Sequence, residues 1–165
     1  MSDSEPVILS SVLAYSGFYL FLAVVLNIIL WASETYAGVV IQSSSVGWMP
    51  PILGAMMAGQ RYGKLTGRKA SGSYAWAASV GFVVVSFVLS IGLIAAVAAF
   101  YGVDLMQVKD TALADLARQG ISPGVIAGIM GGVALLLWAL LRFGFNFGAG
   151  LSVKAAAALA AKTKA

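Results

Sequence analysis

Long stretches without a charged side chain constrain this protein more than any other feature. Residues 7–32, 36–60 and 70–102 contain no charged side chain, and residues 122–147 contain only Arg142. About 20 apolar residues in a helix cross the roughly 30 Å hydrocarbon core of a bilayer, where a helix satisfies its own backbone hydrogen bonds. With 61% apolar and 10% charged residues, the chain is predicted to be an all-α, polytopic membrane protein.

We expect one domain over residues 1–165, with four membrane-spanning helices. The fourth span begins at Ser122 and Pro123, a capping serine followed by a proline whose missing N–H is harmless in the first turn. The expected spans cover about residues 7–32, 45–65, 72–101 and 122–147.

The second span has the least regular sequence. Gln42 and the serines at 43–45 interrupt its apolar pattern, and Pro50 and Pro51 suit only a first turn. We expect a serine-capped start near Ser45, which leaves residues 36–44 as an outer loop or a half-embedded segment. A kinked helix that starts at Tyr36 is the alternative.

A short amphipathic helix is predicted between the third and fourth spans, over about residues 104–119. Its apolar residues recur at helical spacing, and Gly120 is a stop signal, so we expect it to lie on the membrane surface. The tail at 151–165 is basic, alanine-rich and helical by propensity. The apolar positions of the amphipathic segment are Leu105, Met106, Val108, Ala112, Leu113, Leu116 and Ala117.

The distribution of basic residues predicts the orientation, because cytoplasmic loops are enriched in Lys and Arg. The loop between the second and third spans and the end of the fourth span carry most of these residues, whereas the opposite side has Lys109 and Arg118. We therefore expect both termini in the cytoplasm and a location in a bacterial inner membrane. The basic anchor consists of Arg61, Lys64, Arg68, Lys69 and Arg142; its loop part suits anionic headgroups or an acidic partner.

Two series of small residues at four-residue spacing predict where helices pack, because small side chains let backbones approach in lipid. We expect both series to face the bundle interior. They are Ala55, Gly59 and Gly63 in the second span, and Gly124, Gly128 and Gly132 in the fourth.

Three intramembrane amide side chains are polar candidates: Asn27, Gln60 and Asn146. Asn146 shares a helix face with Gly128 at 100° per residue. We expect Asn27 and Asn146 to point inward and hydrogen-bond across helices, since an amide that faces lipid has no partner.

The composition argues against most chemistry. The chain has no Cys and no His, which removes the usual ligands of haem, zinc and iron–sulfur clusters. Its carboxylates Glu34 and Asp104 lie at span ends, whereas ion-coupled transport ordinarily needs one near the midplane. We expect no catalytic residue, no metal, no cofactor and no nucleic-acid binding.

Several short motifs resemble an uncharacterised family of small four-helix bacterial inner-membrane proteins, over roughly residues 8–102. A proline pair opens the second span in that family, and a glycine–arginine turn precedes the third; where its pattern has an acidic residue, this chain has Tyr74. The resemblance implies a four-helix fold and supplies no activity. The motifs are Trp48-Met-Pro-Pro51, Ala58-Gly-Gln60, Gly67-Arg68 and Tyr74-Ala-Trp76.

The sequence has much helix-packing surface and no recognisable set of catalytic side chains. This combination favours a non-catalytic accessory, assembly or stabilising subunit of a larger membrane complex. Its partners would be membrane lipids and other membrane subunits or further copies of itself. The alternative is a small oligomeric transporter or channel with a polar path lined by Asn27, Gln60, Arg61 and Asn146. An enzyme that acts on lipid is a third hypothesis.

Overall fold

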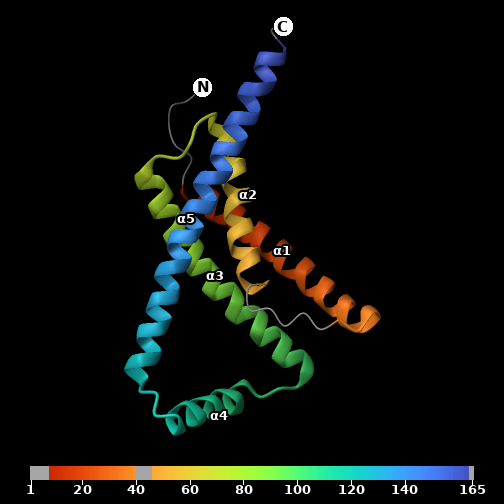
Figure 1. Ribbon diagram of the computed structural model, residues 1–165, viewed down its shortest axis with the longest axis vertical. Coiled ribbons are helices and arrows are strands. Elements are labelled where there is room, and N and C mark those ends of the chain that lie inside the picture. Colours follow the sequence, from red (N-terminus) through yellow and green to blue (C-terminus); the bar gives the residue numbers. More distant parts are fainter. Residues whose placement is uncertain (1–7, 40–45, 164–165) are drawn as a thin grey trace.

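The computed structural model describes residues 8–39 and 46–163, and in these ranges the protein is all-α without strands. The helices alternate with short connections, and Figure 1 shows α4 linking the far ends of α3 and α5. In chain order they are α1 (Ile8–Ala37), the 3₁₀ turn η1 (Val46–Trp48), α2 (Met49–Thr66), α3 (Gly72–Tyr101), α4 (Leu105–Arg118) and α5 (Pro123–Lys162).

Three of these helices, α1, α3 and α5, are long and apolar enough to cross a membrane. They contain 30, 30 and 40 residues, which corresponds to about 45, 45 and 60 Å at 1.5 Å per residue. The 18-residue α2 is more polar, with Gln60, Arg61 and Lys64 in its second half. The chain is therefore a membrane protein with several membrane-capable helices.

Local sequence signals explain where several helices begin and end. Ser122 caps α5 by accepting a hydrogen bond from the Val125 amide, and Pro123 occupies the first turn, which confirms that start signal. Ser71 caps α3 in the same way. The ends of α2 and α3 are followed by Gly67 and Gly102 in the left-handed region, which favours glycine because it has no Cβ.

The first connection differs from the expectation. Because α1 continues to Ala37 and Gly38 then takes a φ of 64°, Tyr36 belongs to the last turn of the first helix, and a kinked second helix from Tyr36 is wrong. The second helix begins at Met49, with Trp48 at its cap position and no side-chain cap. Ser45 and most of the expected loop at 36–44 lie outside the described residues.

The last helix is longer than expected. Rather than ending near residue 147, α5 continues through Gly150 as one helix to Lys162. The alanine-rich sequence after residue 151 has high helix propensity, and α2 packs along the intervening turns and holds them in place. The tail and the fourth apolar segment thus form a single rod as far as Lys162.

The four long helices contact one another in the cyclic order α1, α2, α5, α3. Ser11, Tyr15 and Tyr19 of α1 pair with successive positions of α3, so α1 and α3 run in the same direction. Helices α2 and α5 also run in the same direction, because the residue numbers of their contacts rise together. The pairs α1 with α2 and α3 with α5 are antiparallel. Successive long helices therefore alternate in direction.

Packing is confined to one end of this arrangement, which we call the packed end. Most of its buried side chains come from residues 11–23, 50–63, 74–86 and 137–152. The remaining parts of α1 and α3 and the first half of α5 diverge from one another as an open end of largely exposed apolar side chains, where α4 links α3 to α5 (Figure 1). Gly54 of α2 lies beside Tyr19 and α2 begins only five residues earlier, at Met49, so α2 accompanies little more than the first half of α1.

Candidate functional site

The closest helix contact joins α2 and α5 through two reciprocal glycines. A Cβ placed on Gly59 would lie 2.8 Å from the carbonyl carbon of Phe145 and 3.0 Å from its Cα, and one on Gly148 would lie equally close to Met56. Only glycine fits at such distances, and each Cα–H faces the carbonyl oxygen of the opposite helix. The two backbones are therefore in direct contact.

The series at Ala55, Gly59 and Gly63 forms the α2 side of this contact. All three residues are buried, and a Cβ on Gly63 would lie 2.6 Å from the carbonyl oxygen of Ala149. The α5 side is supplied by a different pair, Gly144 and Gly148, which also has four-residue spacing. That spacing is a sequence signal for the interface, and the chain carries the same signal at Gly124, Gly128 and Gly132.

The other predicted series does not pack within the chain, contrary to expectation. Gly124, Gly128 and Gly132 are exposed on the open half of α5, and at Gly128 and Gly132 no atom of another described helix lies within 4 Å of the position that a Cβ would take. The physical reason is the length of α2, which reaches α5 only along its second half. Helix α2 therefore does not lie beside the first half of α5.

An aromatic cluster fills the packed end around Phe145. Its ring lies 5.6 Å from Tyr62, 6.3 Å from Tyr74 and 5.5 Å from Phe82 between centroids, and it is fully buried. Tyr15 stacks on Phe82 at 4.5 Å. This one ring of α5 thus joins α2 to α3 in offset and edge-on contacts, which aromatic pairs prefer.

Hydroxyl pairs fasten α1 to α3. Tyr15 lies 2.5 Å from the Ser86 hydroxyl, and the Ser86 hydroxyl donates to the carbonyl of Phe82. Since serine has one hydroxyl proton, Tyr15 is the donor of the pair. The Tyr19 and Ser90 hydroxyls are 2.8 Å apart one turn later. Tyr15 and Tyr19 are therefore core residues.

The polar amides do not form the cross-helix contacts that were expected. Asn27 is exposed and donates to the Ala23 carbonyl of its own helix, which is a local alternative for an amide that faces outward. Asn146 is half-buried, and its Oδ1 has no hydrogen-bond partner among the described residues. Gln60 is half-buried on α2, and Asn27 lies beyond the point on α1 where α2 begins. The structure does not bring the three amides together.

The predicted basic anchor divides into two parts. The first four of its members, Arg61, Lys64, Arg68 and Lys69, are exposed around the end of α2 and the start of α3, and the Lys69 side chain reaches α5 beside Gly150. Arg142 is half-buried, and its guanidinium carbon lies 4.1 Å from the centroid of the Trp76 ring, a cation–π contact. Arg142 is thus held by α3.

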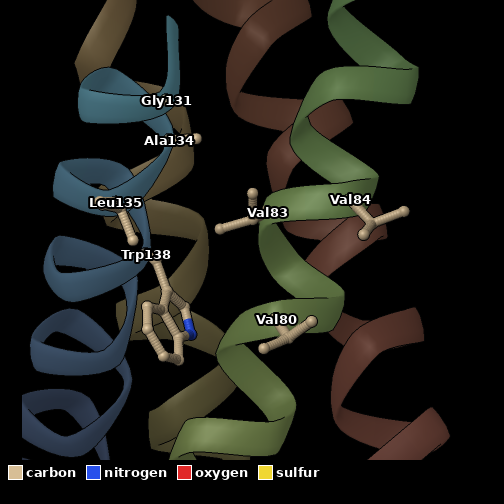
Figure 2. Close-up of a pocket in the computed structure, with 7 residues that line it drawn as sticks. All are labelled: Val80, Val83, Val84, Gly131, Ala134, Leu135 and Trp138. Carbon is tan, nitrogen blue, oxygen red and sulfur yellow. The ribbon is translucent and has the colours of Figure 1, made fainter. Parts of the chain in front are cut away.

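An apolar cleft of about 440 Å³ opens between α3 and the first half of α5. Figure 2 shows Val83 projecting from α3 and the Trp138 ring lying beneath the gap. The Trp138 and Trp76 rings are 4.4 Å apart, so the cleft ends at a tryptophan pair, and Arg142 contacts the Trp76 ring of that pair. Its lining consists of Val80, Val83, Val84, Gly131, Ala134, Leu135 and Trp138.

Models of known protein families, curated proteins and solved structures were compared with this chain, and none gave a significant match. The functional argument therefore depends on geometry. What the described residues offer is helix-packing surface, an apolar cleft and one arginine at its end.

Proposed function

We propose that this protein is a non-catalytic subunit of a larger complex in a bacterial inner membrane. The observation that carries the proposal is the exposed series Gly124, Gly128 and Gly132 on the open end of α5. Glycines weaken a helix by about 0.5–1 kcal/mol each relative to alanine, and in lipid their advantage is the close approach of another backbone. A helix of a partner subunit fits this requirement.

We propose further that the chain crosses the membrane four times, with both termini in the cytoplasm. The alternating directions of α1, α2, α3 and α5 support this topology, because they bring the end of α2 and the end of α5 to one side. That side carries the basic residues, including Arg61, Lys64 and Lys154, as cytoplasmic segments do. The 18-residue α2 would be the inner part of the second crossing. The resemblance noted for residues 8–102 agrees with four crossings.

The amphipathic α4 is proposed to lie on the surface of the inner membrane that faces away from the cytoplasm. Asp104 caps it by accepting a hydrogen bond from the Met106 amide, and its apolar side chains, such as Met106 and Val108, are exposed. Its charged side chains pair with each other, as Arg118 does with Asp115 at 3.3 Å. A helix with one apolar and one charged face has its lowest free energy at the interface between lipid and water.

Co-purification tests the subunit proposal. From native membranes in mild detergent, the protein should carry at least one other membrane protein at fixed stoichiometry. Gly128→Leu should remove that partner while the protein stays folded, and Met130→Leu, at an exposed position on another face of the same helix, should retain it. A monodisperse monomer without a partner, before and after these substitutions, would contradict the proposal.

The transporter hypothesis gains no support from the arrangement of its four residues. Asn27 lies beyond the reach of α2, whereas Gln60 and Arg61 lie near the packed end of α1. Liposome flux that depends on Asn27, Gln60, Arg61 and Asn146 would restore it.

A further inference from the structure

The cleft between α3 and α5 has an apolar wall and a cationic end. The wall is formed by valine, leucine, alanine and glycine residues, and Trp138 closes it on the side of the packed end. One turn further along α5 lies Arg142, at about 6 Å along the helix axis. A single amphiphile with an apolar chain and an anionic head can therefore contact both features.

Arg142 is a cation without a counter-charge in the described part of the chain. Its Nε is buried without a hydrogen-bond partner, and its guanidinium rests on the faces of Trp76 and Phe143. No carboxylate pairs with this guanidinium among the described residues, so its terminal N–H groups are left for an anion. Two parallel N–H groups match the oxygens of a phosphate, with which arginine forms bidentate hydrogen bonds.

The dimensions fit a lipid of one leaflet. Between Pro123 and Arg142 α5 carries no other charge and rises about 29 Å, close to the thickness of the hydrocarbon core, which puts Arg142 at headgroup level. From Arg142 back to Gly131, at the other end of the cleft, the rise is about 16 Å. Half of the hydrocarbon core is about 15 Å, the depth of one acyl chain.

We propose that the cleft binds an anionic phospholipid of the leaflet on the basic side of the protein. One acyl chain lies along Val83, Ala134 and Leu135, and the phosphate is held by Arg142. The tryptophan pair lies where glycerol ester groups meet the chains, a depth that indole rings favour. This site borders the exposed glycine series, since Gly131 of its lining is next to Gly132, and it does not depend on the identity of a partner subunit.

Quenching of tryptophan fluorescence by brominated lipid tests the proposal. The protein is reconstituted in phosphatidylcholine vesicles that contain a small fraction of phosphatidylglycerol with brominated acyl chains. The contribution of Trp138 is obtained by difference from a Trp138→Phe variant. We expect quenching well above the bulk fraction of the brominated lipid, and no such excess when the bromine is carried by phosphatidylcholine.

Three variants separate the two halves of the site. Arg142→Gln should lower the relative affinity for phosphatidylglycerol about tenfold, which corresponds to about 1.4 kcal/mol. Lys154→Gln, which removes an exposed charge from the same helix, should leave it unchanged. Ala134→Phe should reduce quenching at Trp138 by filling the cleft, with Arg142 still present. Circular dichroism and a single elution peak in detergent confirm that each variant is folded.

The same experiment identifies other occupants of the cleft. Quenching in proportion to the bulk lipid fraction, or an equal loss in Arg142→Gln and Lys154→Gln, would overturn the proposal. Full competition by soluble glycerol phosphate would show a headgroup site without an acyl chain and would also overturn it. So would a dimer that Ala134→Phe dissociates, because a second copy would then fill the cleft.

Discussion

Substitution of Gly59 by alanine tests the backbone contact between α2 and α5. The added Cβ would lie 2.8 Å from the carbonyl carbon of Phe145, whereas two carbon atoms reach their best separation at about 3.5–4.0 Å. The helices must therefore move apart by at least about 0.7 Å, because the carbonyl oxygen of Phe145 would lie closer still to the added Cβ. The Phe145 backbone cannot yield alone, because its ring is fixed among Tyr62, Tyr74 and Phe82.

The magnitude follows from that displacement. A radial gap of about 0.5–1 Å forfeits a quarter to a half of each van der Waals well, and overpacking of a close-packed interior typically costs about 1–3 kcal/mol. We expect Gly59→Ala to lower the free energy of unfolding by that amount. Gly148→Ala should act similarly, and the double variant should lose less than the sum, because both relieve the same contact.

The matched control is Gly128→Ala, at a helical glycine with open space around it. Alanine should leave its stability unchanged or raise it by about 0.5–1 kcal/mol through better helix propensity. The assay is equilibrium unfolding by titration of sodium dodecyl sulfate into dodecyl maltoside micelles, followed by tryptophan fluorescence. A loss below about 0.5 kcal/mol in Gly59→Ala, together with a larger loss in Gly128→Ala, would refute the reasoning.

Three further predictions use the same assay or hydrogen exchange. Phe145→Ala should lose about 3 kcal/mol, near the lower limit for such truncations, because lipid also shelters the ring in the unfolded state; a loss below about 1 kcal/mol would contradict its central position. The double-mutant cycle of Tyr15→Phe and Ser86→Ala should give a coupling of about 0.6 kcal/mol, and additive losses would deny the hydrogen bond. Ser122→Ala should speed amide exchange at Val125 about fivefold through loss of about 1 kcal/mol of capping, whereas unchanged exchange would show that the cap is dispensable.

Local chemistry accounts for the parts of the fold that the sequence predicted well. The long uncharged runs predict an all-helical membrane protein, because a segment in lipid must satisfy its own backbone hydrogen bonds and a helix does so. The start of α5 follows from Ser122 and Pro123, because capping depends on neighbouring residues alone. Such features need no knowledge of what lies beside the helix.

The pairing of helix faces was not accessible in the same way. Both Gly128 and Gly148 belong to four-residue glycine series, and sequence spacing does not tell which series meets α2. The decision depends on where α2 begins and how deep it reaches, which are tertiary properties. The pairing of Tyr15 has the same limit, because its partner Ser86 is 71 residues away and no local pattern joins the two.

The cleft was unpredictable from the sequence for the same physical reason. Val83 and Leu135 read as ordinary lipid-facing residues of two separate spans, and their approach depends on the angle between α3 and α5. Arg142 was expected to extend toward the headgroups as a topological anchor. Its stacking on Trp76 is a contact across helices that no local pattern specifies.

The alternating topology, on which the orientation and the lipid site both depend, can be measured directly because the chain has no cysteine. Single cysteines at Thr66, Gln119 and Thr163 would be treated with a membrane-impermeant maleimide in intact spheroplasts and again after permeabilisation. We predict labelling of Gln119→Cys in intact cells and of Thr66→Cys and Thr163→Cys only after permeabilisation. Labelling of Thr66→Cys and Thr163→Cys from opposite sides, or of Gln119→Cys from the same side as Thr163→Cys, would contradict the proposed topology.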